Sequence, residues 1–258
     1  MNASLAKAGE LWSPLKPGKP MAYMNWSGGK DSALCLYRTL QSGSIPVTAL
    51  LTSMNSFHHR ISMHGVRRAL LEAQARAIHI PLHTIELPEQ PDMQVYETAM
   101  MNKLTAFRES GYNTAIFGDI SLEDLRKYRE QTLHTMGIAC RFPLWKLDTG
   151  SLVKEFISLG FKSIVVCVQE EVLDRHFCGR IIDDQFLADL PDHVDPCGEN
   201  GEFHTFVFAG PLFNQPVPFK KGEIVYKRYH APENQDAGDD RKVKASSYGF
   251  YFCDLIPV

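Results

Sequence analysis

Six consecutive residues near the start of the chain have the types and order that phosphate binding requires. The hexapeptide Ser27-Gly28-Gly29-Lys30-Asp31-Ser32 combines two glycines with hydroxyl donors, a cation and a carboxylate. Glycine allows positive φ and lets the backbone come close to an anion. We expect Lys30 to be exposed at a ligand site, and Asp31 either to favour a helix start or to hold a metal ion. The hexapeptide therefore predicts a turn that binds phosphate.

The segments on both sides of the hexapeptide support this prediction. An apolar run over residues 21–26 precedes it, and Leu34, Tyr37 and Leu40 then share one face of a predicted helix. A strand, a glycine turn and a helix together present backbone N–H groups to a phosphate. The residues do not fit the Walker pattern G-x-x-x-x-G-K-[ST]. An ordinary glycine turn capped by Ser and Asp is the alternative.

Strand-like and helical segments alternate through the first half of the chain. Apolar runs at 47–52, 82–87 and 114–117 are typical of buried strands. The alternation predicts a parallel sheet covered by helices on both faces. Ligands of such sheets bind at the carboxyl ends of the strands, and Gly118 and Asp119 follow the strand at 114–117. The helix between the first two runs is expected to bury Val66, Ala69, Leu70, Ala73 and Ala77.

The second half contains further strands and a loop with unusual chemistry. A strand-like run at 139–142 precedes a helix that Thr149 is expected to cap, and an apolar strand follows at 163–168. The loop at 195–205 is rich in glycine and acidic residues. Its Glu199 and Glu202 could position ammonium or a metal ion, or deprotonate ammonium. A solvated loop is the alternative. Residues 248–256 predict a final strand.

Three blocks of the sequence together resemble one enzyme family. They are the hexapeptide, then Phe117-Gly118-Asp119-Ile120, then the run CGENGEFHT at 197–205. The hexapeptide is similar to the SGGxDS signature of the PP-loop ATP pyrophosphatases. All three blocks in this order resemble the diphthine–ammonia ligase family, also described as ATP-binding N-type pyrophosphatases, over residues 21–229. Relatives often have Tyr where this chain has Phe203, so any role of that hydroxyl is absent here.

The resemblance implies an α/β protein with two domains. A parallel-sheet, adenine-nucleotide α-hydrolase-like domain of the PP-loop (HUP) type binds ATP, and a smaller α/β domain helps to form the acceptor site. We assign residues 1–20 to a flexible tail and 21–137 to the PP-loop ATP-binding domain. Residues 138–230 are assigned to the acceptor-binding domain, and 231–258 to a polar linker with a C-terminal strand.

The resemblance also implies a reaction. ATP is cut at its α-phosphate, a carboxylate acceptor is adenylylated with release of pyrophosphate, and ammonia displaces AMP to leave an amide. The acceptor would be diphthine on elongation factor 2 in an archaeal or eukaryotic source, and an unknown carboxylate in a bacterial one. ATP and Mg²⁺ are the expected cofactors, and free ammonium is the expected nitrogen source.

The resemblance and the chemistry of the side chains together suggest roles for individual residues. Catalysis is expected from Lys30, Asp31, Glu199 and Glu202, with Asp31 as the Mg²⁺ ligand. ATP is expected to contact Ser27, Gly28, Gly29, Lys30, Asp31, Ser32, Gly118 and Asp119. The acceptor is expected to contact Gly198, Asn200, Gly201, His204 and Thr205.

Composition argues against several other classes of protein. The chain has 258 residues and a net charge of −3, which gives no electrostatic footprint for nucleic acid. No apolar run is long enough to predict a membrane span. Six cysteines, none in a C-x-x-C pair, indicate a reduced, cytoplasmic protein and argue against tRNA thiolation.

Two other functions stay open at this point. Another PP-loop enzyme could adenylylate a small carboxylate, and a regulatory protein could bind ATP or AMP without turnover. The pair Lys30-Asp31 and the acidic loop favour an enzyme. The sequence does not identify the acceptor or the oligomeric state.

Overall fold

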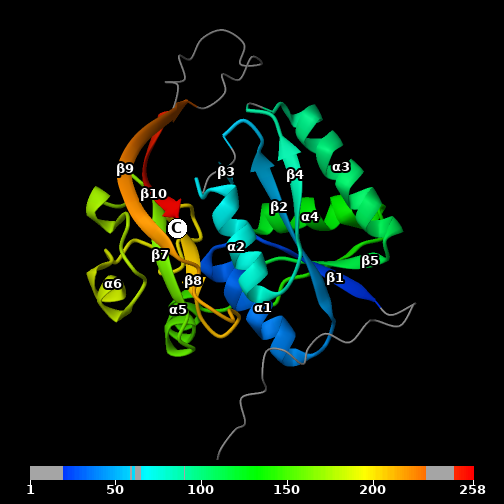
Figure 1. Ribbon diagram of the computed structural model, residues 1–258, viewed down its shortest axis with the longest axis horizontal. Helices are drawn as coiled ribbons and strands as arrows, with labels where there is room; N and C mark the ends of the chain where they lie inside the picture. Colours follow the sequence, from blue (N-terminus) through cyan, green and yellow to red (C-terminus); the bar gives the residue numbers. More distant parts are fainter. Residues whose placement is uncertain (1–19, 59, 62–64, 90, 231–246) are drawn as a thin grey trace, which may run out of the picture.

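Two β-sheets lie side by side in the computed structural model (Figure 1). The structure describes residues 20–58, 60–61, 65–89, 91–230 and 247–258. The predicted tail at 1–20 lies almost entirely outside the described residues, and so does most of the predicted linker after 230.

The first sheet contains the strand that leads into the hexapeptide. Within the described residues its path runs β3-β2-β1-β5-β6, and β4 pairs with β2. All its pairings are parallel except β2 with β3, which confirms the predicted parallel sheet. The strands are β1 (Met21–Asn25), β2 (Val47–Asn55), β3 (Arg60–Ile61), β4 (Leu82–Leu87), β5 (Tyr112–Ile116) and β6 (Ala139–Arg141).

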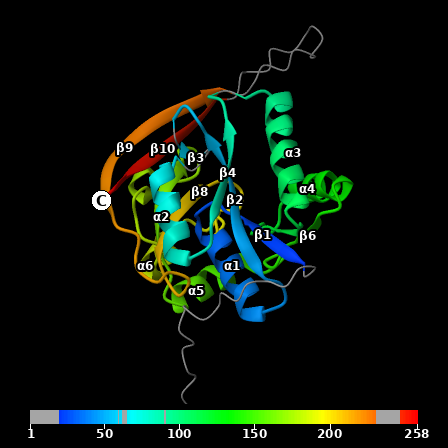
Figure 2. The same cartoon turned by 45° about the vertical axis from the view of Figure 1, so that its right-hand side comes forward.

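Helices cover both faces of this sheet (Figure 2). α1 and α2 lie on the face toward the second sheet, and α3 and α4 lie on the other face. On the α3/α4 face, Tyr23 packs edge-on against Phe107, with ring centroids 5.1 Å apart. The described helices of the first half are α1 (Lys30–Ser42), α2 (Arg68–Ile78), α3 (Met93–Glu109) and α4 (Glu123–Thr135).

The second sheet is antiparallel, with the order β8-β7-β10-β9. Its strands are β7 (Lys162–Gln169), β8 (Phe203–Ala209), β9 (Phe219–His230) and β10 (Ser247–Pro257). The short helices beside it are α5 (Thr149–Ser158), η1 (Arg175–Phe177) and α6 (Asp184–Asp189). Asp148, not Thr149, caps α5, because its carboxylate accepts a hydrogen bond from Ser151 N at 2.7 Å.

Strand pairing differs from the predicted domain boundaries in two places. β6 was assigned to the second domain, but it pairs with β5 and so belongs to the first sheet. β10 was assigned to a separate C-terminal segment, but it pairs with both β7 and β9 in the middle of the second sheet. β9 was not predicted as a strand.

The apolar core is continuous between the two sheets. One cluster of buried side chains contains Leu34 of α1 and Leu71 of α2 together with Phe206 of β8. Tyr37 of α1 also packs against Phe161, with ring centroids 5.8 Å apart. The two sheets therefore form one packed unit, with α1 and α2 between them.

Asp254 of β10 joins the second sheet to the start of α2. Its carboxylate accepts hydrogen bonds from Arg60 Nη2 at 2.9 Å and from Arg67 Nη2 at 2.6 Å. Hydrogen bonding from Arg67 and Arg60 lowers the pKa of Asp254. The C-terminal strand is thus tied to the first sheet by charge as well as by apolar packing.

Asp254→Asn is expected to lower the free energy of unfolding by about 1–3 kcal/mol, because a charge-assisted acceptor is lost. A lowered pKa in the folded state stabilises the protein above the ordinary aspartate pKa, and this stabilisation fades as the pH falls below about 4. The variant should therefore show a flatter pH dependence of unfolding in acid. Urea melts at several pH values measure both effects. Asp124→Asn, at a fully exposed carboxylate, is the control, and an equal loss in both variants would contradict the expectation.

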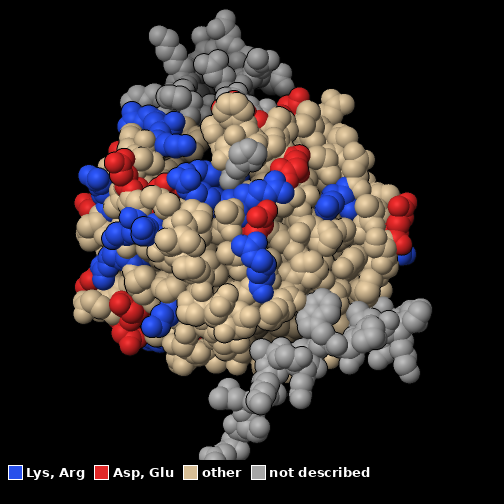
Figure 3. All heavy atoms as spheres, in the orientation of Figure 1, with Lys and Arg blue, Asp and Glu red and all other residues tan. Residues whose placement is uncertain are grey.

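Charged side chains of both signs lie together on one face of the molecule. Figure 3 shows Lys and Arg gathered over the side where β9 and α2 lie, with Asp and Glu among them. Several are paired: Arg68 lies 3.0 Å from Glu72 and 2.8 Å from Glu86.

No helix in the described part of the chain is both long and apolar enough to cross a membrane.

Candidate functional site

The hexapeptide forms a tight turn at the carboxyl end of β1. Gly28 has φ +75°, Gly29 is the residue that precedes the first turn of α1, and the helix begins at Lys30. Gly29 N donates to Ser27 Oγ at 3.2 Å, and the Ser27 hydroxyl donates to Ser32 Oγ at 3.1 Å. The turn therefore places its backbone N–H groups and two hydroxyls at a helix N-terminus, where an anion is favoured.

Lys30 is buried, with 3% of its side chain exposed, which corrects the expectation that it is exposed. Its ammonium donates to Asp31 Oδ1 at 2.8 Å, to Asp31 Oδ2 at 2.7 Å, and to the backbone oxygen of Cys197. Burial, the largest single effect, would lower the pKa of Lys30, but Asp31, Cys197 and Glu199 together outweigh it, and the pKa is raised. Lys30 is therefore a charged group held between the hexapeptide and the acidic loop.

The acidic loop is held in shape by Glu202, which is 4% exposed. Glu202 Oε1 accepts from Asp195 N at 3.1 Å and from Asn200 Nδ2 at 2.9 Å, and its Oε2 accepts from Asn200 N at 2.8 Å. Gly198 N and Gly201 N also donate to carbonyls within the loop. The carboxylate of Glu202 thus bonds to the loop itself. The sequence instead predicted that Glu202 acts directly on ammonium or a metal ion.

Glu199 connects the acidic loop to the Gly118-Asp119 turn. Its Oε1 accepts from Ile120 N at 2.9 Å and from Ser121 N at 2.8 Å. Burial raises the pKa of Glu199, and the two backbone N–H groups only partly oppose this effect. Both backbone donors end on the same oxygen, so Oε2 is the atom that these donors do not occupy.

Gly118 and Asp119 lie against the first turn of α1. A Cβ added at Gly118 would lie 3.1 Å from backbone atoms of Asp31 and Ser32, so a side chain there would crowd the first turn of α1. Asp119 Oδ2 lies 3.0 Å from Arg129 Nη1, but it is buried without a hydrogen-bond partner in the described part of the chain. Burial raises the pKa of Asp119, Arg129 opposes this, and Asp31 adds to it. The negative charge of Asp31 therefore disfavours the charged form of Asp119.

Three residues of β8 complete the site. The Thr205 hydroxyl oxygen accepts from Lys30 N at 3.0 Å, so Thr205 contacts the first residue of α1 instead of standing apart at an acceptor site. His204 is half-buried, and burial, with a contribution from Lys30, lowers its pKa to about 4. His204 is therefore neutral at physiological pH. Phe203 faces Lys30, whose Nζ lies 5.7 Å from the ring centroid.

Sequence reasoning missed Gln74, which is fully buried on α2 and bonds directly to Gly28. The predicted buried stripe of α2 included Ala69, which is exposed, and omitted Gln74. A polar residue at the spacing of Leu70, Gln74 and Ile78 is the signal that could have identified it, because a buried amide requires hydrogen-bond partners.

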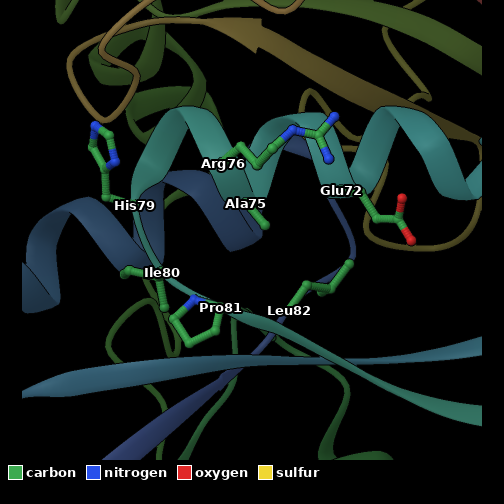
Figure 4. Close-up of a pocket in the computed structure, with 7 residues that line it drawn as sticks. All are labelled: Glu72, Ala75, Arg76, His79, Ile80, Pro81 and Leu82. Atoms are coloured by element: carbon green, nitrogen blue, oxygen red, sulfur yellow. The ribbon is translucent and has the colours of Figure 1, made fainter.

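A groove on the surface lies away from this site. This groove of about 430 Å³ runs along the end of α2 and the start of β4. Figure 4 shows its lining residues, with Arg76 and His79 on the helix side and Pro81 and Leu82 on the strand side. None of the predicted site residues lines it, so the candidate site rests on the geometry of the hexapeptide and the acidic loop.

Comparisons with known proteins identify the family of the chain. Residues 21–140 match the model of the diphthamide synthase N-terminal domain, and residues 148–232 match that of the diphthamide synthase C-terminal domain. Human diphthine–ammonia ligase is 24% identical over 224 residues, which cover 77% of this chain and 82% of the human protein. The zebrafish (Danio rerio) ligase is 24% identical over 221 residues, which cover 77% of this chain and 86% of that protein.

The parallel sheet and the glycine turn at the start of α1 define an α/β protein with a nucleotide-binding domain of the PP-loop type. The two domain models together match most of the chain, and they meet between β6 and α5. The chain therefore belongs to the diphthine–ammonia ligase family, which is a family of ATP-dependent ligases. The resemblance inferred from the three sequence blocks is confirmed.

Proposed function

We propose that the chain activates a carboxylate with ATP and converts it to an amide with ammonia. The observation that carries the proposal is the glycine turn at the N-terminus of α1, which holds Lys30 beneath the acidic loop. A carboxylate oxygen attacks the α-phosphorus, and the bond from that phosphorus to the bridging oxygen of pyrophosphate breaks. Ammonia then attacks the acyl carbon, and AMP leaves with the electrons of its bond to that carbon.

The turn and Lys30 act on the departing pyrophosphate. The backbone N–H groups of Gly29 and Lys30 lie at the N-terminus of α1, where they donate to Ser27 Oγ and Thr205 Oγ1. With the Ser27 and Ser32 hydroxyls, they would bind the β- and γ-phosphates by exchanging these partners for phosphate oxygens. The positive charge of Lys30 stabilises the negative charge that develops on the leaving group, and it does so in a buried place where charges interact strongly.

Mg²⁺ fits the acidic residues beside the turn. Asp119 Oδ2 is a buried oxygen without a hydrogen-bond partner in the described part of the chain, although Arg129 Nη1 lies 3.0 Å away. Burial, with a smaller contribution from Asp31, raises the pKa of Asp119. Mg²⁺ uses one or two carboxylates together with phosphate oxygens and relieves repulsion of this kind. Asp31 and Asp119 would hold the ion, which when bound neutralises the pyrophosphate.

Glu199 is the residue best suited to accept a proton from ammonium. Its raised pKa makes it a stronger base than an ordinary glutamate, and its Oε1 is fixed by two backbone N–H groups. Gly198, Asn200 and Gly201 lie in the same loop and would border the acceptor. His204 of β8, a neutral imidazole, would border it as well.

The acceptor class follows from the relatives. Human and zebrafish relatives are named for diphthine and ammonia, so a diphthine carboxylate on a partner protein is the leading candidate. A different carboxylate acceptor would use the same residues.

All six cysteines are free thiols, which supports a cytoplasmic location.

The bond cut in ATP tests the proposal. Purified protein with acceptor, ammonium and Mg²⁺ should convert ATP to AMP and pyrophosphate, and chromatography of α- and γ-labelled ATP separates these products from ADP and phosphate. Formation of ADP would refute adenylylation. Tight ATP or AMP binding without turnover on any acceptor would favour a regulatory nucleotide-binding protein, because Lys30 and the acidic loop would then bind without reacting.

A further inference from the structure

Gln74 makes three hydrogen bonds beside the glycine turn. It is 0% exposed, and it lies on α2 among apolar side chains. Its Oε1 accepts from the Trp26 indole at 2.9 Å, and its Nε2 donates to Gly28 O at 2.9 Å and to Val207 O at 2.6 Å. The indole N–H can only donate, so Oε1 must face Trp26 and both Nε2 hydrogens must face the two carbonyls.

These bonds hold the Gly28 carbonyl on the protein side of the turn. The same carbonyl also accepts from Val207 N at 2.9 Å. A trans peptide unit is planar, and its C=O and N–H point in opposite directions. Fixing Gly28 O therefore fixes the N–H of the next residue, Gly29, on the opposite side, at the N-terminus of α1.

The space around Gly28 supports the same conclusion. A Cβ added at Gly28 would lie 2.7 Å from Gln74 Oε1 and 2.7 Å from Leu71 Cδ2. Gly28 also has φ +75°, a backbone conformation that residues other than glycine rarely adopt. The turn and α2 are thus fitted to each other at Gln74, and a change in the Gln74 side chain acts directly on the turn.

We infer that Gln74 is a positioning residue for the phosphate-binding turn: it fixes the Gly28–Gly29 peptide, so that the Gly29 N–H and the Ser27 hydroxyl oxygen to which it donates at 3.2 Å lie where the β,γ-pyrophosphate of ATP would bind. This inference rests on the proposed function, since it assigns the turn to phosphate. It predicts a selective effect: ligands that carry pyrophosphate depend on Gln74, and AMP, which lacks those phosphates, does not.

Binding of three ligands to Gln74→Met tests the inference. Methionine keeps the length and most of the volume of glutamine but loses both donors to the carbonyls. By calorimetry, the dissociation constants of Mg-ATP and of inorganic pyrophosphate should rise about tenfold or more, as for the loss of a hydrogen bond to a charged group. The dissociation constant of AMP should change less than about twofold. Gln41→Met, at an exposed position at the end of α1, is the matched control and should leave all three constants unchanged.

A second variant guards against a folding defect. Gln74→Glu keeps the acceptor for Trp26 but removes the donors to Gly28 O and Val207 O, so it should show the same selective loss. Equal weakening of ATP and AMP in both variants, unchanged binding, or a failure of both variants to fold would overturn the positioning role. If the wild-type protein binds neither ATP nor pyrophosphate, the proposed function itself fails. Wild-type binding with unchanged binding by both variants overturns only the inference.

Discussion

Lys30→Met is expected to lower the rate constant for AMP formation by about 10²- to 10³-fold, the loss typical when a group that stabilises developing charge is removed. Methionine keeps the apolar stem of Lys30, so the buried volume beneath Cys197 stays filled. It removes the ammonium, so the pyrophosphate leaves without that positive charge. Quenched-flow measurement of labelled AMP, at saturating ATP and acceptor, separates this rate from binding.

Folding must be controlled in this experiment, because Lys30 is buried and bonded to Asp31 and Cys197. Circular dichroism melts of the variant show whether the remaining partners still support the fold. Lys154→Met, at an exposed lysine of α5, is the matched control and should leave the rate unchanged. AMP formation within about twofold of wild type by folded Lys30→Met protein would contradict the role of Lys30.

The sequence alone predicts the position of the site because its signal is local. The hexapeptide contains the two glycines, the hydroxyls and Lys30 within six residues, and the strand and helix around it follow from hydrophobic periodicity. The parallel sheet follows in the same way from the alternation of runs. The resemblance of three blocks then adds the family, because their order and content are far more specific than any one of them.

Contacts between distant segments could not be predicted in this way. Thr205 meets Lys30 N across 175 positions, and Gln74 meets Val207 across 133. Neither contact leaves a local pattern, because each depends on how α1 and α2 pack against β8. For the same reason the burial of Lys30 was not foreseen: a lysine in a glycine turn looks exposed until the acidic loop folds over it.

These distant contacts also change which half of the chain is expected to act on ATP and which on the acceptor. The sequence placed ATP on the first half and the acceptor on the second. In the structure Cys197 and Thr205, both from the second half, bond to Lys30, and Glu199 bonds to the turn after β5. The two halves therefore meet at the proposed nucleotide site, and a change in the acidic loop should affect the proposed ATP chemistry.

Glu202→Gln is expected to lower the efficiency of AMP formation, kcat/KM for ATP, by about 10²-fold, because misplacing catalytic groups by a small distance costs about this much. The carboxylate of Glu202 accepts three hydrogen bonds from Asp195 and Asn200. An amide has only one oxygen, so its NH₂ group must face at least one of these donors. The loop then shifts, and Cys197 O and Glu199 move away from Lys30 and from the turn after β5.

The structural consequence of Glu202→Gln can be measured separately from activity. Hydrogen exchange of the Ile120 and Ser121 amides should speed up, because both N–H groups are held by Glu199 in the displaced loop. Glu171→Gln, at an exposed glutamate after β7, should change neither exchange nor kinetics. Loss of activity with unchanged exchange would mean that the Glu202 carboxylate acts in the chemistry itself, as the sequence first suggested. Unchanged activity would show that the loop tolerates the amide and that its hold on Lys30 does not depend on Glu202.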